Sequence, residues 1–200
     1  MGLPVSAVLL AAGSSKRMGQ PKQLLQLGNR TVIRYCLDAI IAAGLQDIIV
    51  VVGSDGDEIA AAIRGLPVVI VRNESRQSEM AASVRIGLRA VEDHASGVLI
   101  CLTDHPLASG DTLEVLVIEH QATPDKIIIP AYRGKRGHPT LFPRSVVEEV
   151  FSGDNLRDVI GRDPGRVRII DVGDEGVVLD MDTREDYENI VQKLAARKGR

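Results

Sequence analysis

Three cations follow a small-residue turn near the start of the chain. The apolar run that ends at Leu10 leads into an Ala-Ala-Gly-Ser segment at 11–14, and Lys16, Arg17 and Lys22 lie within seven positions of one another. Small residues let backbone N–H groups approach an anion closely, and the cations add full charges. This pattern is typical of a site for a nucleoside triphosphate, although a strand-to-helix connection with solvated basic residues has the same composition.

A carboxylate follows a second apolar run. Asp104 comes two positions after the end of Val98–Leu102, and Pro106 restricts the chain just beyond it. A hard carboxylate in this position can hold Mg²⁺ against substrate phosphates, or it can cap a helix or a turn. Because ligands of open α/β sheets bind beyond the carboxyl ends of the strands, we expect Asp104 and the loop after Leu10 to face one cleft.

Two further segments carry polar groups that such a site would use. Asp180 and Asp182 follow the strand-like run Val177–Leu179, and in an extended chain they point to the same side. They would complete a Mg²⁺ site or cap the last helix. The Gly- and Arg-rich segment 133–139 lies between two apolar runs, which predicts a hairpin or flap with His138 in it, or simply an exposed basic turn.

Composition and missing motifs exclude several classes of protein. The 200 residues contain neither a G-x-x-x-x-G-K-[ST] loop nor a G-x-G-x-x-G after the first strand. A net charge of −3 and 2% aromatic residues argue against nucleic acid as a partner. No apolar run approaches the length of a membrane span. Cys36 and Cys101 stand far apart in apolar segments, so we expect reduced thiols and a cytoplasmic location without a signal peptide.

Apolar runs alternate with helix-patterned segments along the chain, which predicts an α/β fold. We expect a single domain over residues 1–200, with a mainly parallel, Rossmann-like sheet, helices on both faces and a small hairpin or flap. The expected strands are Val5–Leu10, Ile48–Val52, Val68–Val71, Val98–Leu102 and Ile127–Ile129. The expected helices are Thr31–Ala43, Asp57–Arg64, Glu79–Val91, Thr112–Gln121, Arg144–Phe151 and Thr183–Arg197, the last opening with a capping box at Thr183 and Asp186.

Four spaced blocks resemble one family. They are the L-A-A-G-x-S-x-R-M-G-x-x-K pattern at 10–22, Thr-Asp-His-Pro at 103–106, Gly-His-Pro at 137–139 and Asp-Met-Asp-Thr-Arg-Glu-Asp-Tyr at 180–187. The chain resembles the MobA-like nucleotidyltransferases and, among them, the molybdenum cofactor cytidylyltransferases, with the fold of nucleotide-diphospho-sugar transferases. It departs from the family at His105, where Gln is common, and at Glu79, Ala81 and Ala82, where Gly and serines are usual.

The resemblance assigns roles to individual residues. It implies catalytic roles for Arg17, Lys22 and Asp104, and Mg²⁺ ligands at Asp104 and Asp182. The nucleotide-binding residues that it implies are Leu10, Ala11, Ala12, Gly13, Ser14, Arg17, Lys22 and Thr103. Contacts with the acceptor are expected from Ser83, Arg136 and His138.

The reaction that the resemblance implies is transfer of CMP from CTP to the terminal phosphate of molybdenum-molybdopterin, with release of pyrophosphate and with a molybdenum hydroxylase as client. Ala-Ala-Gly at 11–13 resembles the cytidylyltransferase form of the loop. A phosphomonoester is already ionised near neutral pH, so no general base is required. Two alternatives are transfer to another phosphorylated small molecule, such as a sugar or alcohol phosphate, and a carrier that binds the finished cofactor without catalysing transfer.

Overall fold

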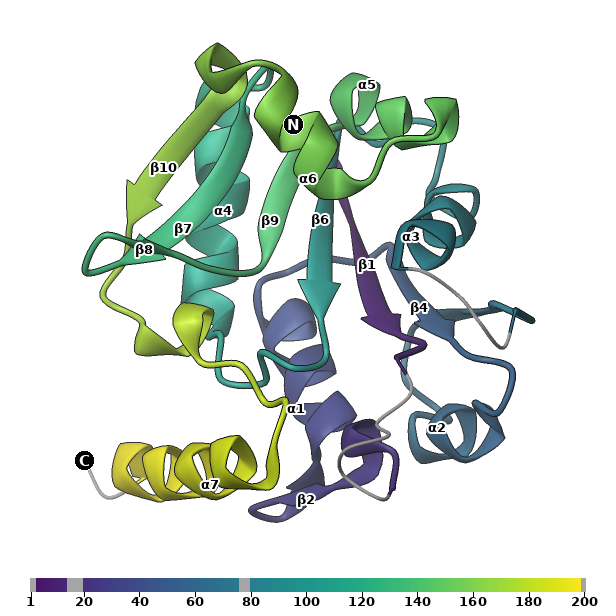
Figure 1. The fold of residues 1–200 in the computed structure, drawn as a ribbon, viewed down its shortest axis with the longest axis vertical. Coiled ribbons are helices and arrows are strands. Elements are labelled where there is room, and N and C mark those ends of the chain that lie inside the picture. The colour runs from purple at the N-terminus through teal and green to yellow at the C-terminus, as the bar shows by residue number, and fades with distance from the viewer. Residues whose placement is uncertain (1–2, 14–19, 76–79, 199–200) are drawn as a thin grey trace.

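The protein is built on a twisted sheet whose strands are the apolar runs of the sequence. The computed structural model describes residues 3–13, 20–75 and 80–198 (Figure 1). The strands of the main sheet are β1 (Val5–Ala11), β4 (Ile48–Val52), β5 (Val69–Arg72), β6 (Gly97–Leu102), β7 (Ile127–Tyr132), β8 (Lys135–Arg136), β9 (Thr140–Pro143) and β10 (Val167–Asp171). Two short strands, β2 (Gln26–Leu27) and β3 (Arg30–Thr31), form a separate hairpin.

The strand order is β10-β7-β9-β6-β1-β4-β5, with β8 added to β7. Pairing is parallel between β1 and both of its neighbours, between β4 and β5, and between β7 and β10. Strand β9 alone runs antiparallel to β6 and β7 within this order. Every residue of β1 is buried, as expected for a central parallel strand covered on both faces.

Helices cover the sheet on both faces and create two apolar cores. The first core contains Leu9 with Ile33 and Leu37, and the second contains Val8 with Val84 and Leu88. Alternate residues of β1 therefore face opposite layers. On the first face lie α1 (Val32–Ala42), α2 (Asp57–Ala62) and α4 (Gly110–Ala122), and on the second lie α3 (Met80–Leu88), α5 (Arg144–Val147) and α6 (Leu156–Arg162).

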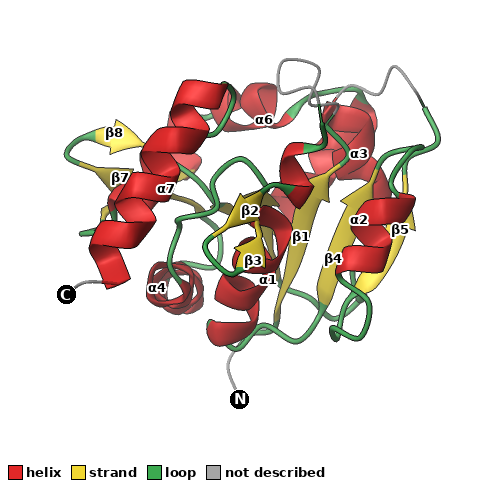
Figure 2. Ribbon diagram, turned by 90° about the horizontal axis from the view of Figure 1, so that it is seen from below, coloured by secondary structure: helices red, strands yellow, loops and turns green. Residues whose placement is uncertain are grey.

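A third, smaller core lies beyond the carboxyl ends of β1 and β6. It joins Leu27 and Leu107 to Met181 and to Ile190 of α7 (Arg184–Lys198). Figures 1 and 2 show α7 and the β2-β3 hairpin at this end of the sheet. Short 3-10 helices complete the chain: η2 (Lys22–Leu24), η3 (Glu148–Ser152), η4 (Pro164–Arg166) and η5 (Glu175–Val178).

The fold class expected from the sequence is confirmed, and the expected elements are found with shifts of a few residues. The hairpin expected at 133–139 is present, because β8 pairs with β7 around Arg133 and Gly134, both of which have positive φ. The capping box is also present, since the Thr183 amide donates to Asp186 Oδ2 at 2.7 Å and the Asp186 amide to Thr183 Oγ1 at 3.2 Å.

Other features were not expected. The sequence reading missed β9, β10 and α6. Strand β9 and helix α6 are short, and β10 is mostly exposed at the edge of the sheet. The prediction of a strand-like run at Val177–Leu179 was wrong, because residues 175–178 form the 3-10 helix η5. Gly176 in this helix lies so close to the chain that an added Cβ would stand 2.0 Å from the Leu107 carbonyl oxygen, so a tight turn packs here in place of a strand. Within the described residues, no helix has the length and apolar character of a membrane span.

Candidate functional site

The small-residue loop leaves β1 at its carboxyl end and is held there by a buried glutamine. Gln23 is 1% exposed, and its side-chain Nε2 donates to the carbonyl oxygens of Ala11 at 3.0 Å and Gly13 at 3.1 Å. Gln23 belongs to η2, the short helix that Pro21 precedes. The sequence reading overlooked Gln23, because a glutamine beside a lysine is usually solvated and only the structure shows that it is buried.

Lys22 places its ammonium between two carboxylates from distant parts of the chain. Its Nζ donates to Asp104 Oδ2 at 3.2 Å, to Asp182 Oδ1 at 3.1 Å and to the Met181 carbonyl at 3.3 Å. The Lys22 side chain is 14% exposed, so these ion pairs are partly shielded from water. Three sequence-predicted residues from three separate segments therefore meet at one point.

Asp104 is positioned by the end of β6. The preceding Thr103 fixes the two neighbouring strand ends together, because both its amide and its hydroxyl donate to the Leu10 carbonyl, at 3.4 and 3.1 Å. One carboxylate oxygen of Asp104 accepts from Lys22, while the other, Oδ1, is buried and has no hydrogen-bond partner within residues 3–13, 20–75 and 80–198. A buried oxygen without a donor is a costly arrangement that a bound cation would relieve.

Asp182 reaches the site from the segment before α7. Met181 is fully buried in the third core, and the Asp182 amide donates to Asp186 Oδ2 at 3.1 Å, which fixes the backbone. Asp180 acts on a different part of the site. Burial lowers the pKa values of His105 and His138, and the negative charge of Asp180 opposes part of this lowering, so it faces the histidines. The two aspartates thus serve different sides of the site.

A cavity of about 140 Å³ opens beside Lys22 and Asp104. Its walls include seven of the residues expected in the site, six of them as nucleotide or acceptor contacts and Asp104 as a catalytic residue and metal ligand, together with Met80 and Leu102, which were not expected. The expected ones are Leu10, Ala12, Gly13, Lys22, Ser83, Thr103 and Asp104. Ala11 is buried in the first core and meets the site through its carbonyl alone. Ser14 and Arg17 lie outside the described residues.

The donor set fits a hard divalent cation that is completed by substrate. Asp104 and Asp182 both present carboxylate oxygens to the same Lys22 ammonium, and Asp104 Oδ1 has no donor. In the described part of the chain, no group of three or more His, Cys, Asp or Glu side chains forms a metal cluster. Mg²⁺ is commonly held in this way, by one or two carboxylates plus substrate phosphates and water.

The histidine pair borders the same site. The rings of His105 and His138 lie 4.9 Å apart between centroids, and His105 Nε2 lies 3.9 Å from Asp104 Oδ1. Burial lowers the pKa of His105 and lowers that of His138 to about 4, so both rings are neutral near pH 7. His138 could therefore meet a phosphate as a neutral N–H donor and not as a cation. Arg136 is exposed on β8, and it is not among the residues that line the 140 Å³ cavity.

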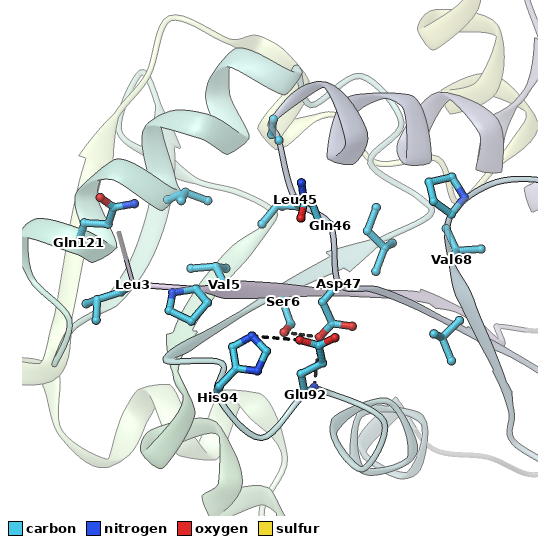
Figure 3. A pocket seen from close by; sticks show the side chains of 17 residues that line it. Leu3, Val5, Ser6, Leu45, Gln46, Asp47, Val68, Glu92, His94 and Gln121 are labelled. Carbon is cyan, nitrogen blue, oxygen red and sulfur yellow. Dashed lines mark hydrogen bonds and ion pairs between the residues drawn. The ribbon is translucent and has the colours of Figure 1, made fainter. Parts of the chain in front are cut away.

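A larger pocket, of about 620 Å³, lies at the opposite, amino end of β1 and β4. Figure 3 shows Ser6, Asp47, Glu92 and His94 pointing toward one another in it. Asp47 Oδ2 accepts from the Ser6 hydroxyl at 2.5 Å and from the Glu92 amide at 3.2 Å, and His94 Nε2 lies 3.0 Å from Glu92 Oε2. We call this the amino-end pocket. No residue expected to act in nucleotide chemistry lines it.

The fold and the Lys22 cluster define an α/β protein with a charged site beyond the carboxyl ends of its strands, where open α/β sheets bind ligands. The family model of the MobA-like NTP transferase domain matches residues 7–165. The chain belongs to this family.

Three relatives illustrate the likeness. Rv0371c from Mycobacterium tuberculosis H37Rv is 33% identical, with a TM-score of 0.81 over 96% of this chain and 99% of that one, and a manganese complex of Rv0371c is also known. A nucleotidyl transferase from Methanothermobacter thermautotroptrophicus is 26% identical, with a TM-score of 0.85 over 98% of this chain and 100% of that one. Nicotine blue oxidoreductase from Paenarthrobacter nicotinovorans is 32% identical over 94% of this chain and 96% of its own length.

Proposed function

We propose that the protein is a Mg²⁺-dependent cytidylyltransferase that transfers CMP from CTP to the terminal phosphate of molybdenum-molybdopterin and releases pyrophosphate. One observation carries the proposal of nucleotidyl transfer. The Lys22 ammonium lies within 3.2 Å of both Asp104 and Asp182, at the mouth of the small-residue loop. This arrangement supplies the cation and the carboxylates that a triphosphate and its metal require.

The bond changes are simple. An oxygen of the acceptor phosphate forms a bond to the α-phosphorus of CTP, and the bond from that phosphorus to the bridging oxygen of pyrophosphate breaks. The acceptor phosphate is ionised near neutral pH, so no side chain has to remove a proton. The site has only to align the two phosphates and stabilise the charge that moves onto pyrophosphate.

Residues of this chain divide that work. Lys22 reaches toward the 140 Å³ cavity and would neutralise charge at the α-phosphate, while Arg17 is proposed for the β- and γ-phosphates. Asp104 and Asp182 would hold Mg²⁺, which when bound neutralises phosphate charge. Thr103 and Gln23 keep the loop and the end of β6 in place through their hydrogen bonds. Ser83, Arg136 and His138 are proposed to contact the acceptor.

The choice of CTP rests on the Ala-Ala-Gly segment at 11–13, whose last two residues line the cavity. The choice of molybdopterin, with a molybdenum hydroxylase as client, rests on the resemblance of the four sequence blocks. The manganese complex of Rv0371c supports a divalent metal in this family. Cys36 and Cys101 are buried and unpaired, which supports a cytoplasmic location.

The test is a product assay. Purified protein is incubated with Mg²⁺, molybdenum-loaded molybdopterin and either CTP or GTP, and pyrophosphate and the mass of the pterin are followed. We expect a CMP-linked pterin from CTP that Lys22→Ala does not form. Protein that folds and binds CTP yet forms no product would contradict molybdopterin as acceptor, and sugar and alcohol phosphates would then be tried. Nucleotide and metal binding without pyrophosphate from any acceptor would support the carrier instead.

A second candidate function comes from the relative named nicotine blue oxidoreductase, which matches this chain over nearly the full length of both proteins. Under this alternative the site would bind nicotine blue and exchange electrons with it. A change in the absorbance of nicotine blue, with a reduced dinucleotide added as electron donor, would measure this activity. Activity that survives in Lys22→Ala, together with no pyrophosphate from the wild type, would favour the oxidoreductase over the transferase.

A further inference from the structure

Gln23 is a buried polar side chain directly after the proposed catalytic lysine, and its side-chain amide donates to the backbone of the nucleotide loop. An amide NH₂ has two hydrogens, and the two acceptors of Gln23 Nε2 are the carbonyls of Ala11 and Gly13. Its acceptor atom, Oε1, is buried and has no hydrogen-bond partner among the described residues. The side chain is therefore kept in this position by the loop carbonyls at the expense of one unsatisfied oxygen.

This contact fixes the direction of the peptide groups that border the cavity. Because the C=O and N–H of a trans peptide point in opposite directions, the Ala12 N–H is turned away from Gln23 when the Ala11 carbonyl faces it. The next carbonyl, that of Ala12, faces Gly53, where an added Cβ would lie 3.3 Å from it. Ala12 and Gly13 both line the cavity. The pattern of backbone donors and acceptors offered to a ligand is thus set by one side chain.

We propose that Gln23 is a positioning residue that sets nucleotide selectivity by locking the backbone of Ala11, Ala12 and Gly13. The inference rests on the proposed function, because it takes this segment to be the part of the site that distinguishes CTP from GTP. A backbone-lined wall can exclude a purine by shape only while it is rigid. Without the two hydrogen bonds of Gln23, the wall can shift and admit the larger base.

A purely structural role predicts a different result. Loss of a buried hydrogen-bonded amide would then lower the stability of the protein. It would weaken the binding of CTP and GTP equally or not at all. The chain offers a matched control in Ser6, which is 1% exposed. Ser6 lies at the amino end of β1, the strand whose carboxyl end leads into residues 11–13. Its hydroxyl donates to Asp47, far from the loop, so Ser6→Ala also removes a buried polar contact of β1 without touching residues 11–13.

The experiment measures dissociation constants of CTP and GTP by calorimetry for the wild type, Gln23→Met and Ser6→Ala. Gln23→Met keeps the approximate size of the side chain but cannot donate. We expect the ratio of GTP to CTP dissociation constants to fall by about 10-fold in Gln23→Met, within the range that pocket contacts give. We expect the ratio to be unchanged in Ser6→Ala. An unchanged ratio in folded Gln23→Met, or equal weakening of both nucleotides, would overturn the proposal.

A second measurement needs no variant and covers the case in which Gln23→Met does not fold. Hydrogen exchange of the Gln23 side-chain NH₂ group is followed by NMR in the wild type with no ligand, with CTP and with GTP. We expect slow exchange before any ligand is added, because both hydrogens are donated to the carbonyls of Ala11 and Gly13, and little further change with CTP. Fast exchange without ligand would show that Gln23 does not hold the loop rigid.

Failure of the proposed function gives a separate signature. If the wild type prefers CTP but releases no pyrophosphate, transfer is wrong while the role of Gln23 can still be judged from the ratio. If the wild type prefers GTP, the cytidylyl assignment falls, and a change of that preference in Gln23→Met still supports the positioning role. A wild type that binds both nucleotides equally would overturn both.

Discussion

The two ends of strand β1 carry pockets of opposite character. The amino-end pocket is the larger, at about 620 Å³, while the cavity at the carboxyl end measures about 140 Å³. In the amino-end pocket the Ser6 hydroxyl is bound by Asp47, and His94 is beside Glu92, so neighbouring groups satisfy one another. At the carboxyl end, the Lys22 ammonium is shared by two carboxylates, and Asp104 Oδ1 has no donor.

The larger pocket is therefore not the one in which we propose nucleotidyl transfer, so pocket volume alone is a poor guide to the proposed active site. The carboxyl-end site contains charged groups from three segments that are distant in sequence. One of its buried oxygens, Asp104 Oδ1, has no donor among the described residues, so a bound cation would stabilise it. Its polar groups are also held by the ends of parallel strands, where open α/β sheets bind ligands. The following variants compare the two ends, beginning with the largest expected effect.

The strongest expected effect is that of Asp104→Asn. The substitution keeps the size of the side chain and removes the charge that holds Lys22 and the proposed metal. We expect the rate of pyrophosphate release to fall by about 10²- to 10³-fold, as for other preorganised charge-stabilising groups. Steady-state assays with CTP measure this, and a loss of less than about 3-fold would remove Asp104 from the catalytic machinery.

The two C-terminal aspartates provide a matched pair. Asp182 contacts Lys22 at 3.1 Å, whereas Asp180 acts on His105 and His138. We expect Asp182→Asn to lower the rate by roughly 10-fold or more, and Asp180→Asn to lower it by roughly 2-fold, because only the former loses a proposed metal ligand. The same assay at several Mg²⁺ concentrations checks this, and equal effects of the two variants would contradict the assignment of the ligand.

Lys22 and a divalent cation compete for the same carboxylate oxygens. In Lys22→Met the competing charge is gone, so we expect the nucleotide-free protein to bind Mn²⁺ about 5- to 10-fold more tightly, although transfer is lost. Calorimetry with Mn²⁺ alone measures the effect. Weaker Mn²⁺ binding in Lys22→Met than in the wild type would show that Asp104 and Asp182 do not receive the metal.

At the amino end, Asp47→Asn tests the other side of the comparison. Asp47 accepts hydrogen bonds from the Ser6 hydroxyl and from the Glu92 amide, so we expect the variant to lose stability and not activity. We expect the free energy of unfolding to fall by about 1–3 kcal/mol, the usual range for hydrogen bonds to a charged group. Urea unfolding measures this, and the transfer rate should stay within about 2-fold of the wild type. A large loss of activity in folded protein would mean that the amino-end pocket is coupled to the site.

The smallest expected effect is the contribution of His120 to the pH dependence of the free energy of unfolding. It is fully buried and its Nε2 lies 3.2 Å from the Ser96 hydroxyl. Burial lowers the pKa of His120, so below about pH 6.5 the unfolded chain binds a proton that the folded chain does not. The free energy of unfolding therefore falls as the pH drops through this range, with a slope of at most about 1.4 kcal/mol per pH unit, until the lowered pKa is reached.

The variant His120→Gln should lose this part of the acid sensitivity. His105 and His138 also have lowered pKa values, so the wild type keeps some dependence on pH from them, and only the difference between the two proteins tests His120. Urea midpoints at about pH 7.5 and about pH 5.5 provide the measurement. An identical pH dependence in both proteins would mean that His120 is not held neutral by the fold.

Much of the fold could be predicted because each central element has a strong local pattern. Strand β4 has the predicted bounds, since Ile48–Val52 is an uninterrupted β-branched run. Strand β10 was missed because its residues are mostly exposed at the edge of the sheet, where no apolar run is required. The run at 177–179 was misread, because its apolar side chains serve a 3-10 turn that packs tightly against the chain near Leu107.

The site could be predicted in part for a similar reason. Lys22, Asp104 and Thr103 could be named because cations and polar residues in the loops that follow buried strands are visible in the sequence, and the structure brings Lys22 and Asp104 into contact. Gln23 was missed because a lone glutamine beside a lysine reads as a solvated residue, and only tertiary contact shows that it is buried. The separation of Asp180 from Asp182 also needed the structure, since the strand expected before them is replaced by the 3-10 helix η5.

The sequence by itself determined the strands, the small-residue loop and the kinds of charge available at the carboxyl ends, because these follow from local pattern and from the direction of parallel strands. Only the tertiary structure decided that the ammonium of Lys22 lies between Asp104 and Asp182, and that Gln23 holds the loop beside it. The contacts of Lys22 join residues about 80 and 160 positions apart. Such pairs are set by the packing of whole layers, which no local pattern contains.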